Sequence, residues 1–181
     1  MQQHPAAQLV FVDESSTHVA MTPLYARTPR GKRAYGAVPR NKGANITLLA
    51  ALTRQGMTAA MTVPGAVDSL VFERYIEHVL LPALSPGQTV VMDNLSVHKR
   101  ARVAQLLHDH GCTLRFLPTY SPDLAPIEGG FSKVKTLVRR DQPRTREALD
   151  QSIGRALAAV STDDAQGWFQ RCGYLLTRQP F

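Results

Sequence analysis

Short apolar runs alternate with amphipathic stretches along the chain, and this pattern predicts a mixed α/β fold. Five runs have the length and the β-branched, aromatic composition of strands, namely 8–13, 44–53, 57–63, 88–92 and 113–117. The second and third are joined by Arg54-Gln55-Gly56, a short connection typical of a hairpin. The first and fourth are mostly apolar and lead to Asp13 and Asp93, so we expect two buried strands that each end at an aspartate.

Helices are predicted where apolar residues recur every three or four positions, at 68–81, 96–110, 127–140, 145–160 and 163–171. Pro82 ends the first of these, and Gly111 suits the cap that follows the second. The order of strand, hairpin, helix, strand, helix, strand and helix predicts a mixed sheet flanked by helices, which is the order of an RNase H-like fold. The pattern alone leaves other α/β folds open. Residues 23–43 are rich in turn-forming residues and are expected to form an irregular ribbon.

Composition narrows the class of protein without indicating an activity. A chain of 181 residues, 44% of them apolar, is long enough for one domain with a real core. No apolar run approaches the roughly 20 residues needed to span a bilayer, and Met1–Val12 lacks the basic flank of a signal peptide. Cys112 and Cys172 make neither a disulfide framework nor a metal cluster. We therefore expect a cytoplasmic protein with no membrane partner.

The distribution of charge points to a polyanionic partner. The chain carries a net charge of +7, and no acidic residue stands between Glu14 and Asp68. That stretch holds seven basic residues interleaved with two tyrosines, namely Arg27, Arg30, Lys32, Arg33, Arg40, Lys42 and Arg54, with Tyr25 and Tyr35. Because unopposed cations repel one another, we favour an anionic ligand over a solvated loop that has no partner.

Three carboxylates are the candidate chemistry. Asp13 and Asp93 stand where two buried strands are expected to end, and ligands of α/β sheets bind in the crevice at such strand ends. One aspartate there can be merely a turn residue or a helix cap, and this alternative stays open for Asp93. Glu128 follows Pro126 at the expected start of a helix. A capping box would need serine or threonine where Ala125 stands, so the glutamate can instead point across to the sheet.

A site made of carboxylate oxygens selects hard cations, here Mg²⁺ or Mn²⁺. Two such ions about 4 Å apart can bracket a scissile phosphate, one activating the nucleophile and the other stabilising the leaving oxygen. The sequence shows no Ser-His-Asp or Cys-His grouping and no phosphate-binding GxxxxGK[ST] loop. The histidines at 18, 78, 108 and 110 lack the paired spacing of a metal site.

Three motifs, in order, resemble those of the DDE/D transposases of the mariner superfamily, in particular its bacterial insertion-sequence branch. The motifs are FVDE at 11–14, VMDN at 91–94 followed by His98 and Lys99, and LPTYSPDLAPIE at 117–128 continued by SKVK at 132–135. Thirty-four residues separate Asp93 from Glu128, a spacing similar to that of the family. The resemblance covers residues 8–140.

This resemblance implies an RNase H-like fold in which Asp13, Asp93 and Glu128 are catalytic and hold Mg²⁺ or Mn²⁺, as two ions. It implies cleavage of a DNA strand by water and then attack of a 3′-hydroxyl on target DNA, without a covalent protein intermediate. A homodimer or a larger assembly is expected, because two transposon ends must be joined. Asn94 and His98 match motif positions, and we expect them to orient Asp93, to contact the backbone, or to be merely structural.

The expected DNA contacts combine the basic stretch with two lysines after the third motif: Arg27, Arg30, Lys32, Arg33, Arg40, Lys42, Lys133 and Lys135. We expect one catalytic domain over 1–181, with its core at 8–140 and C-terminal helices at 145–173. The helix-turn-helix region that precedes the first catalytic strand in the family is expected to be absent. Recognition of transposon ends is then expected to come from another polypeptide, from a longer frameshifted product, or not to occur at all.

Two departures from the family pattern concern the start of the third helix. Ala125 stands where the family usually has asparagine, which costs about 1 kcal/mol of helix capping. Gly129-Gly130 in the first helical turn costs roughly another 2 kcal/mol relative to two alanines. We therefore expect Glu128 to be less firmly held, and activity to be reduced.

Two rival functions stay open at this stage. An RNase H-like nuclease would cleave strands without joining them, and a strand-transfer assay separates it from a transposase. A non-catalytic DNA-binding remnant would need only the basic stretch at 27–54, and it would show no Mg²⁺ or Mn²⁺ binding that depends on Asp93.

Overall fold

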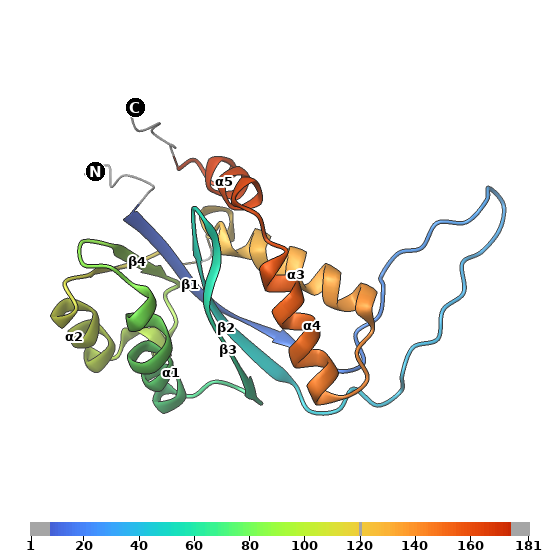
Figure 1. Ribbon diagram of the computed structural model, residues 1–181, viewed down its shortest axis with the longest axis horizontal. Coiled ribbons are helices and arrows are strands. Elements are labelled where there is room, and N and C mark those ends of the chain that lie inside the picture. Colours follow the sequence, from blue (N-terminus) through green and yellow to red (C-terminus); the bar gives the residue numbers. More distant parts are fainter. Residues whose placement is uncertain (1–7, 120, 175–181) are drawn as a thin grey trace.

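A mixed five-stranded sheet runs through the middle of the molecule, in the strand order β3-β2-β1-β4-β5 (Figure 1). The computed structural model describes residues 8–119 and 121–174 of the chain. The strands are β1 Leu9–Thr17, β2 Ile46–Thr53, β3 Gly56–Pro64, β4 Thr89–Met92 and β5 Thr113–Phe116. The pairs β1–β2 and β2–β3 are antiparallel, whereas β1–β4 and β4–β5 are parallel. All five predicted strands are therefore present.

The helices follow the predicted order. They are α1 Ser69–Tyr75, which continues as a π-helical turn η2 Ile76–Leu80 and a 3-10 turn η3 Leu81–Ala83, then η4 Ser96–Lys99, α2 Ala101–Asp109, η5 Pro122–Leu124, α3 Ile127–Asp141, α4 Arg146–Ala158 and α5 Thr162–Arg171. Side chains of Asp68, Thr145 and Ser161 cap the N-termini of α1, α4 and α5. None of these helices has both the length and the apolar character needed to cross a bilayer.

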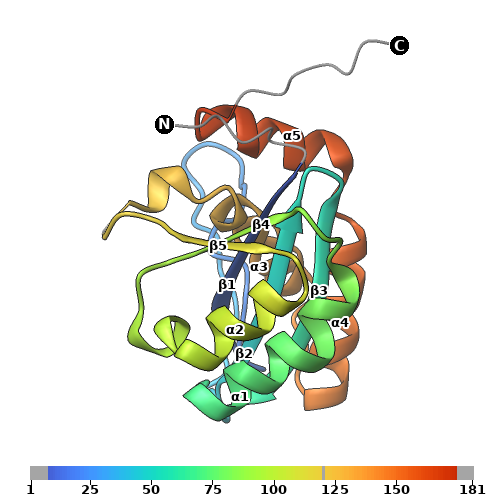
Figure 2. The ribbon, with the colours of Figure 1, turned by 90° about the vertical axis from the view of Figure 1, so that its left-hand side faces the viewer.

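Helices cover both faces of the sheet, and the alternation of side chains along β1 explains why (Figure 2). Phe11 points to the face covered by α3, α4 and α5, where it packs in one core cluster with Phe131 and Phe169. Val12 points to the opposite face, where it shares a second cluster with Phe72 of α1. Since the central strand is buried on both faces, its apolar residues at 9–12 form a continuous run rather than an alternating one.

The first strand does not end at Asp13, so that boundary was wrong. β1 continues to Thr17, because β2 still pairs with it there and Thr17 lies opposite Ile46. The parallel partner β4 stops at Met92, opposite Val12. Asp13 is therefore the first residue of β1 to lie beyond the end of its parallel neighbour.

The helix predicted at 96–110 is in fact two elements. Arg100 has an extended backbone, with φ −67° and ψ 133°, and it separates the 3-10 turn η4 from α2. The break turns η4 toward the end of β4, where its residue His98 lies at the edge of the candidate site. The break could not be predicted from the spacing of apolar residues, because a 3-10 turn and an α-helix both place residues i and i+3 on one side.

Residues 22–45 form no helix or strand and project from the body as a long arm, which we call the basic arm (Figure 1). This agrees with the irregular ribbon expected there. At its outer end the chain reverses through a turn in which Lys32 N–H bonds to Pro29 O and Gly31 adopts a φ of +82°. At its base, the Arg144 guanidinium donates hydrogen bonds of 3.1 Å to the carbonyls of Val19 and Met21.

Candidate active site

Asp13 and Asp93 lie side by side where the pairing of β1 with β4 ends. The last paired residues are Val12 and Met92, and each aspartate is the residue that follows, Asp13 within β1 and Asp93 just beyond β4. Alternation along β1 directs the Asp13 side chain to the same face as Phe11, which is the face that α3 covers. The expectation that two strand ends bring two carboxylates together thus agrees with the register.

The first turn of α3 brings Glu128 to the same place. Ile127 is 1% exposed and anchors this turn in the core cluster that contains Phe11. The helix begins at Ile127, as predicted, but its cap is Pro126 rather than Ala125 and no side chain makes a cap bond. The Glu128 amide is satisfied instead by the Ala125 carbonyl, at 3.1 Å.

One pocket of about 340 Å³ is lined by all three carboxylates. Its other lining residues are Asn94, Leu95, Leu117, Pro118, Thr119, Ser121, Pro122 and Ala125. They come from the loop after β4 and from the third sequence motif, whose Tyr120 lies outside the described residues. Within 8–119 and 121–174, no three His, Cys, Asp or Glu side chains are grouped tightly enough to hold a single metal ion. The carboxylates therefore share a pocket without forming a closed cluster.

The pKa of Asp13 is raised to about 7, mainly by burial. A hydrogen bond of 2.7 Å from the Glu14 amide opposes this rise, as does the charge of His98. The negative charges of Asp93 and Glu128 contribute to the rise, because like charges repel. A cation in the pocket would relieve that repulsion.

Asp93 is held by two hydrogen bonds to one of its oxygens. The His98 imidazole donates from Nδ1 to Asp93 Oδ1 at 2.5 Å, and the Leu95 amide donates to the same oxygen at 3.1 Å. Burial alone would raise the pKa of Asp93, but the bonds from His98 and Leu95 outweigh it and the pKa is lowered. Asn94 bonds instead to Thr119 Oγ1 at 3.1 Å, which ties the loop after β4 to the loop after β5.

The six basic residues between 27 and 42 that are predicted to bind DNA all lie on the basic arm (Figure 1). None of them lines the pocket of the three carboxylates. Tyr25 and Tyr35 on the same arm are 91% and 89% exposed. No ion pair joins any of these six to a carboxylate in the part of the chain that is described. The arm therefore presents free positive charge and exposed aromatic rings.

The two lysines of α3 have different surroundings. Lys133 forms an ion pair with Asp164 of α5, so it has a partner within the protein, and its predicted contact with DNA stays a prediction. Lys135 is half-buried, and burial and the charge of Arg139 lower its pKa. The negative charges of Glu128 and Asp13 raise the pKa of Lys135, so its ammonium lies within the electrostatic field of the site.

Two residues whose charges affect the candidate residues, or are affected by them, were not selected from the sequence. Besides burial, the charge of Arg139 lowers the pKa of both Lys135 and His18. Arg139 stands four residues after Lys135 on α3, and this helical spacing could have identified it from the sequence. Burial raises the pKa of Glu14, and the charge of His98 opposes part of this rise. Its position in FVDE was visible in the sequence, but alternation along a strand turns it away from Asp13 and gave no reason to include it.

Solved structures of Mos1 transposase share this architecture, whereas no curated protein sequence matches the chain. The Mos1 strand transfer complex aligns with a TM-score of 0.74 and 17% identity, over 92% of this chain and 52% of the Mos1 chain. The mariner Mos1 paired-end complex with Mg gives 0.73 and 16%, over 94% and 55%. The Mos1 catalytic domain gives 0.65 and 14%, over 92% and 78%. These matches confirm the RNase H-like fold, and the chain spans about half the length of the Mos1 chains in the complexes.

The sequence also matches the model of a protein family. The model of the DDE superfamily endonuclease family matches residues 8–150, which is most of the chain and includes the three carboxylates of the pocket. The description of this family names endonuclease chemistry. The chain belongs to the DDE superfamily endonucleases.

Proposed function

We propose that this chain is the catalytic domain of a transposase, in which Asp13, Asp93 and Glu128 hold divalent metal ions at the scissile phosphate of DNA. The observation that carries the proposal is the pocket at the end of β4, where three carboxylates from distant parts of the sequence meet. The domain comprises the core at 8–140 and the helices at 145–173. Strand cleavage is the chemistry of the family, and strand joining is the additional step that we propose.

The donor set fits Mg²⁺ or Mn²⁺, because carboxylate oxygens are the ligands that these hard cations prefer. Mos1 structures are described with each of the two metals. We propose that Asp13, Asp93 and Glu128 would together hold two such ions.

The two aspartates are prepared for this role in the same way. The hydrogen bonds to Asp93 engage Oδ1, and the bond from the Glu14 amide engages Oδ1 of Asp13. In each case the second oxygen, Oδ2, is available to a metal while the first keeps the carboxylate from rotating. When bound, two such ions supply activation of the attacking water or 3′-hydroxyl and stabilisation of the leaving oxygen.

The DNA is proposed to run from the pocket along α3 toward the basic arm. Glu128, Lys135 and Arg139 are separated by seven and four residues, so they lie along one side of the helix over about 16 Å. Arg139 and Lys42 both lower the pKa of His18, which burial lowers first, and this indicates that positive groups crowd together where the arm returns to the body. Such a strip of cations suits a phosphate backbone.

The sequence motifs support a narrower assignment within the transposases. We propose that the chain belongs to the bacterial insertion-sequence branch and acts in the bacterial cytosol. Mos1 structures include paired-end complexes, one with the left transposon end, and we propose by analogy that two copies of this domain act together on two DNA ends. A separate helix-turn-helix polypeptide would then recognise those ends.

Nicking of supercoiled plasmid DNA tests the proposed site. The wild-type chain is expected to nick the plasmid with Mn²⁺ or Mg²⁺, and Asp13→Asn, Asp93→Asn and Glu128→Gln are each expected to abolish nicking while DNA binding in a gel-shift assay is kept. Asp123→Asn is the matched control, because Asp123 is an exposed acid of η5 beside the pocket and should be dispensable. Nicking retained in any of the three variants removes that residue from the site.

Strand transfer distinguishes a transposase from a nuclease. Oligonucleotides with free 3′-hydroxyl ends are incubated with plasmid target and metal, and covalently joined product supports the transposase. Metal-dependent nicking with no joined product would favour an RNase H-like nuclease. Binding of DNA without nicking, in a chain that shows no Mn²⁺ binding dependent on Asp93, would favour a non-catalytic remnant.

A further inference from the structure

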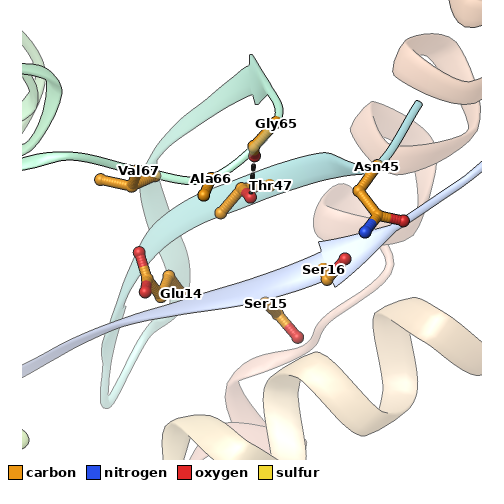
Figure 3. A pocket seen from close by; sticks show the side chains of 8 residues that line it. All are labelled: Glu14, Ser15, Ser16, Asn45, Thr47, Gly65, Ala66 and Val67. Atoms are coloured by element: carbon orange, nitrogen blue, oxygen red, sulfur yellow. Dashed lines mark hydrogen bonds between the residues drawn. The ribbon is translucent and has the colours of Figure 1, made fainter.

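Glu14 is a half-buried acid beside the site that the proposed chemistry does not use. It follows Asp13 directly, so the two side chains point to opposite faces of the sheet. Figure 3 shows Glu14 on the side of the segment Gly65–Val67, whereas Ser15 points the other way. Its carboxylate oxygen Oε2 is buried and has no hydrogen-bond partner among the described residues. Geometry therefore argues against Glu14 as a metal ligand and leaves its charge unexplained.

His98 also has a buried polar atom without a hydrogen-bond partner among the described residues. Its imidazole is fully buried at 0% exposure, and its ring lies 4.4 Å from that of Phe72 between their centroids. Nδ1 is occupied by Asp93, but Nε2 is buried and has no partner in the described part of the chain. Phe72 belongs to the core cluster on the face to which Glu14 points, so the ring of His98 reaches that face. Nδ1 thus binds a residue of the site, whereas Nε2 is left without a partner in the described part of the chain.

The two unpartnered atoms belong to one region of the fold. β1 and β4 are paired up to Val12 and Met92, so Glu14 lies two residues further along β1, beside the loop that leads from β4 to His98. Burying a carboxylate without compensation is costly. Of the groups that act on Glu14, His98 is the one that favours its charged form.

We propose that Glu14 acts through His98 to fix Asp93 for metal binding, as a positioning residue that supports the site from the opposite face of the sheet. The inference rests on the proposed role of Asp93 as a ligand. Asp93 stands on a loop just beyond a strand of four residues, so the strand alone does not set the orientation of its carboxylate. In this proposal the His98 imidazole, which bonds to Asp93 and is acted on by Glu14, sets that orientation, because outer partners of this kind orient a metal ligand and raise its affinity.

The proposed interaction between Glu14 and His98 can be tested without any metal. In protein with ¹⁵N-labelled histidine, Glu14→Gln is expected to shift the ring nitrogen resonances of His98, which are identified by their loss in His98→Asn. Glu73→Gln is the matched control, because Glu73 is a half-buried acid of α1 that pairs with Arg100 and should leave His98 unchanged. His98 resonances that do not move in Glu14→Gln would overturn the proposal, whatever the chain does with metals.

The functional link is tested by Mn²⁺ binding, measured from the electron paramagnetic resonance signal of free Mn²⁺. Glu14→Gln is expected to weaken binding roughly three- to tenfold, less than the 10- to 100-fold typical of a residue that touches the ligand directly. The amide nitrogen of Asn replaces Nδ1 of His98, and that of Gln replaces Nε2. His98→Asn is therefore expected to keep more affinity than His98→Gln, because it preserves the bond to Asp93.

The double variant decides whether Glu14 works through His98. If it does, Glu14→Gln has no further effect in the His98→Asn background, whereas independent roles would multiply the two losses and overturn the proposal. Wild-type binding that Glu14→Gln leaves unchanged overturns the role of Glu14 alone. No Mn²⁺ binding by the wild type, or unchanged binding in Asp93→Asn, overturns the proposed function and this role with it.

Discussion

The indole of Trp168 lies against Gly129, so closely that a Cβ added to this glycine would lie 2.6 Å from the ring. Trp168 comes from α5, and Gly129 follows Glu128 in the first turn of α3. At Gly130 a Cβ would lie 2.7 Å from the sulfur of Met57 in β3. The two glycines lower the helix propensity of this turn, but their lack of a side chain lets α5 and β3 pack directly on the turn that carries Glu128. This packing opposes the loosening of Glu128 that the glycines alone suggest.

Gly129→Ala should destabilise the protein even though alanine favours a helix by about 1 kcal/mol. The added methyl group has to displace the indole, and overpacking of this kind typically costs about 1–3 kcal/mol. We expect a lower free energy of unfolding in urea and, because Glu128 moves with its turn, weaker Mn²⁺ binding.

Gly154→Ala is the control for this substitution. Gly154 also lies within a helix, α4, but a Cβ there would meet nothing within 4 Å. The same chemical change should thus stabilise the protein by up to about 1 kcal/mol. Equal stability gains in the two variants would show that the indole yields easily and that the contact does not hold Glu128.

Metal binding should be coupled to loss of a proton from Asp13. Burial and the charges of Asp93 and Glu128 raise the pKa of Asp13 to about 7, and a metal binds the ionised form. Between pH 6 and pH 8 the ionised fraction rises about tenfold, so Mn²⁺ affinity should rise by about the same factor. Titration calorimetry at pH 6 in buffers of different ionisation enthalpy should register the released proton. Affinity independent of pH across this range would contradict the shifted pKa.

The stability of the metal-free protein should change with pH in the opposite direction. The folded state keeps the Asp13 proton up to about pH 7, whereas the unfolded chain loses it near pH 4, so the folded state binds more protons between these values. The contribution of Asp13 therefore lowers stability as the pH rises through this window. Urea unfolding at pH 5 and pH 7.5 measures it, and Asp13→Asn should flatten the difference.

Much of this arrangement could be predicted from sequence, and the exceptions have a common cause. Strands 9–12 and 89–92 were visible because both faces of each are buried, which makes the run continuously apolar. The end of β1 was missed because Glu14 to Thr17 are polar and stay in the strand through pairing with β2, about 30 residues away. The apolar pattern reports burial, and it does not report a partner.

The site shows the same division. Motif spacing was sufficient to predict that Asp13, Asp93 and Glu128 come together in one pocket, whereas their catalytic role stays a prediction. The close fit of Trp168 to Gly129 could not be read from the motifs, since it joins helices whose approach depends on the whole core. A pair of glycines in a helix looks like a defect until the side chain that occupies their space is known.

The two predicted DNA-binding lysines of α3 should behave differently. Lys135→Ala should weaken binding of short duplex DNA, because this ammonium lies in the field of Asp13 and Glu128 where the scissile phosphate is proposed to sit. Lys133→Ala should mainly lower the free energy of unfolding, because it breaks the ion pair with Asp164 that joins α3 to α5. Fluorescence anisotropy and urea unfolding measure the two effects. An equal loss of DNA affinity in both variants would mean that Lys133 leaves Asp164 to reach DNA.

Charge reversal on the basic arm should weaken DNA binding and reduce its dependence on salt. Arg30, Lys32 and Arg33 lie near the outer end of the arm, where no carboxylate in the described chain pairs with them. Each phosphate contact contributes about 0.9 to the slope of log affinity against log salt concentration for duplex DNA. Replacing all three by glutamate should thus lower that slope by between two and three if each contacts a phosphate. Arg102→Glu on α2, which already pairs with Glu77, is the control and should leave the slope nearly unchanged. A triple variant with the wild-type slope would mean that the arm projects away from the DNA, and its exposed Tyr25 and Tyr35 would then favour a protein partner over phosphates.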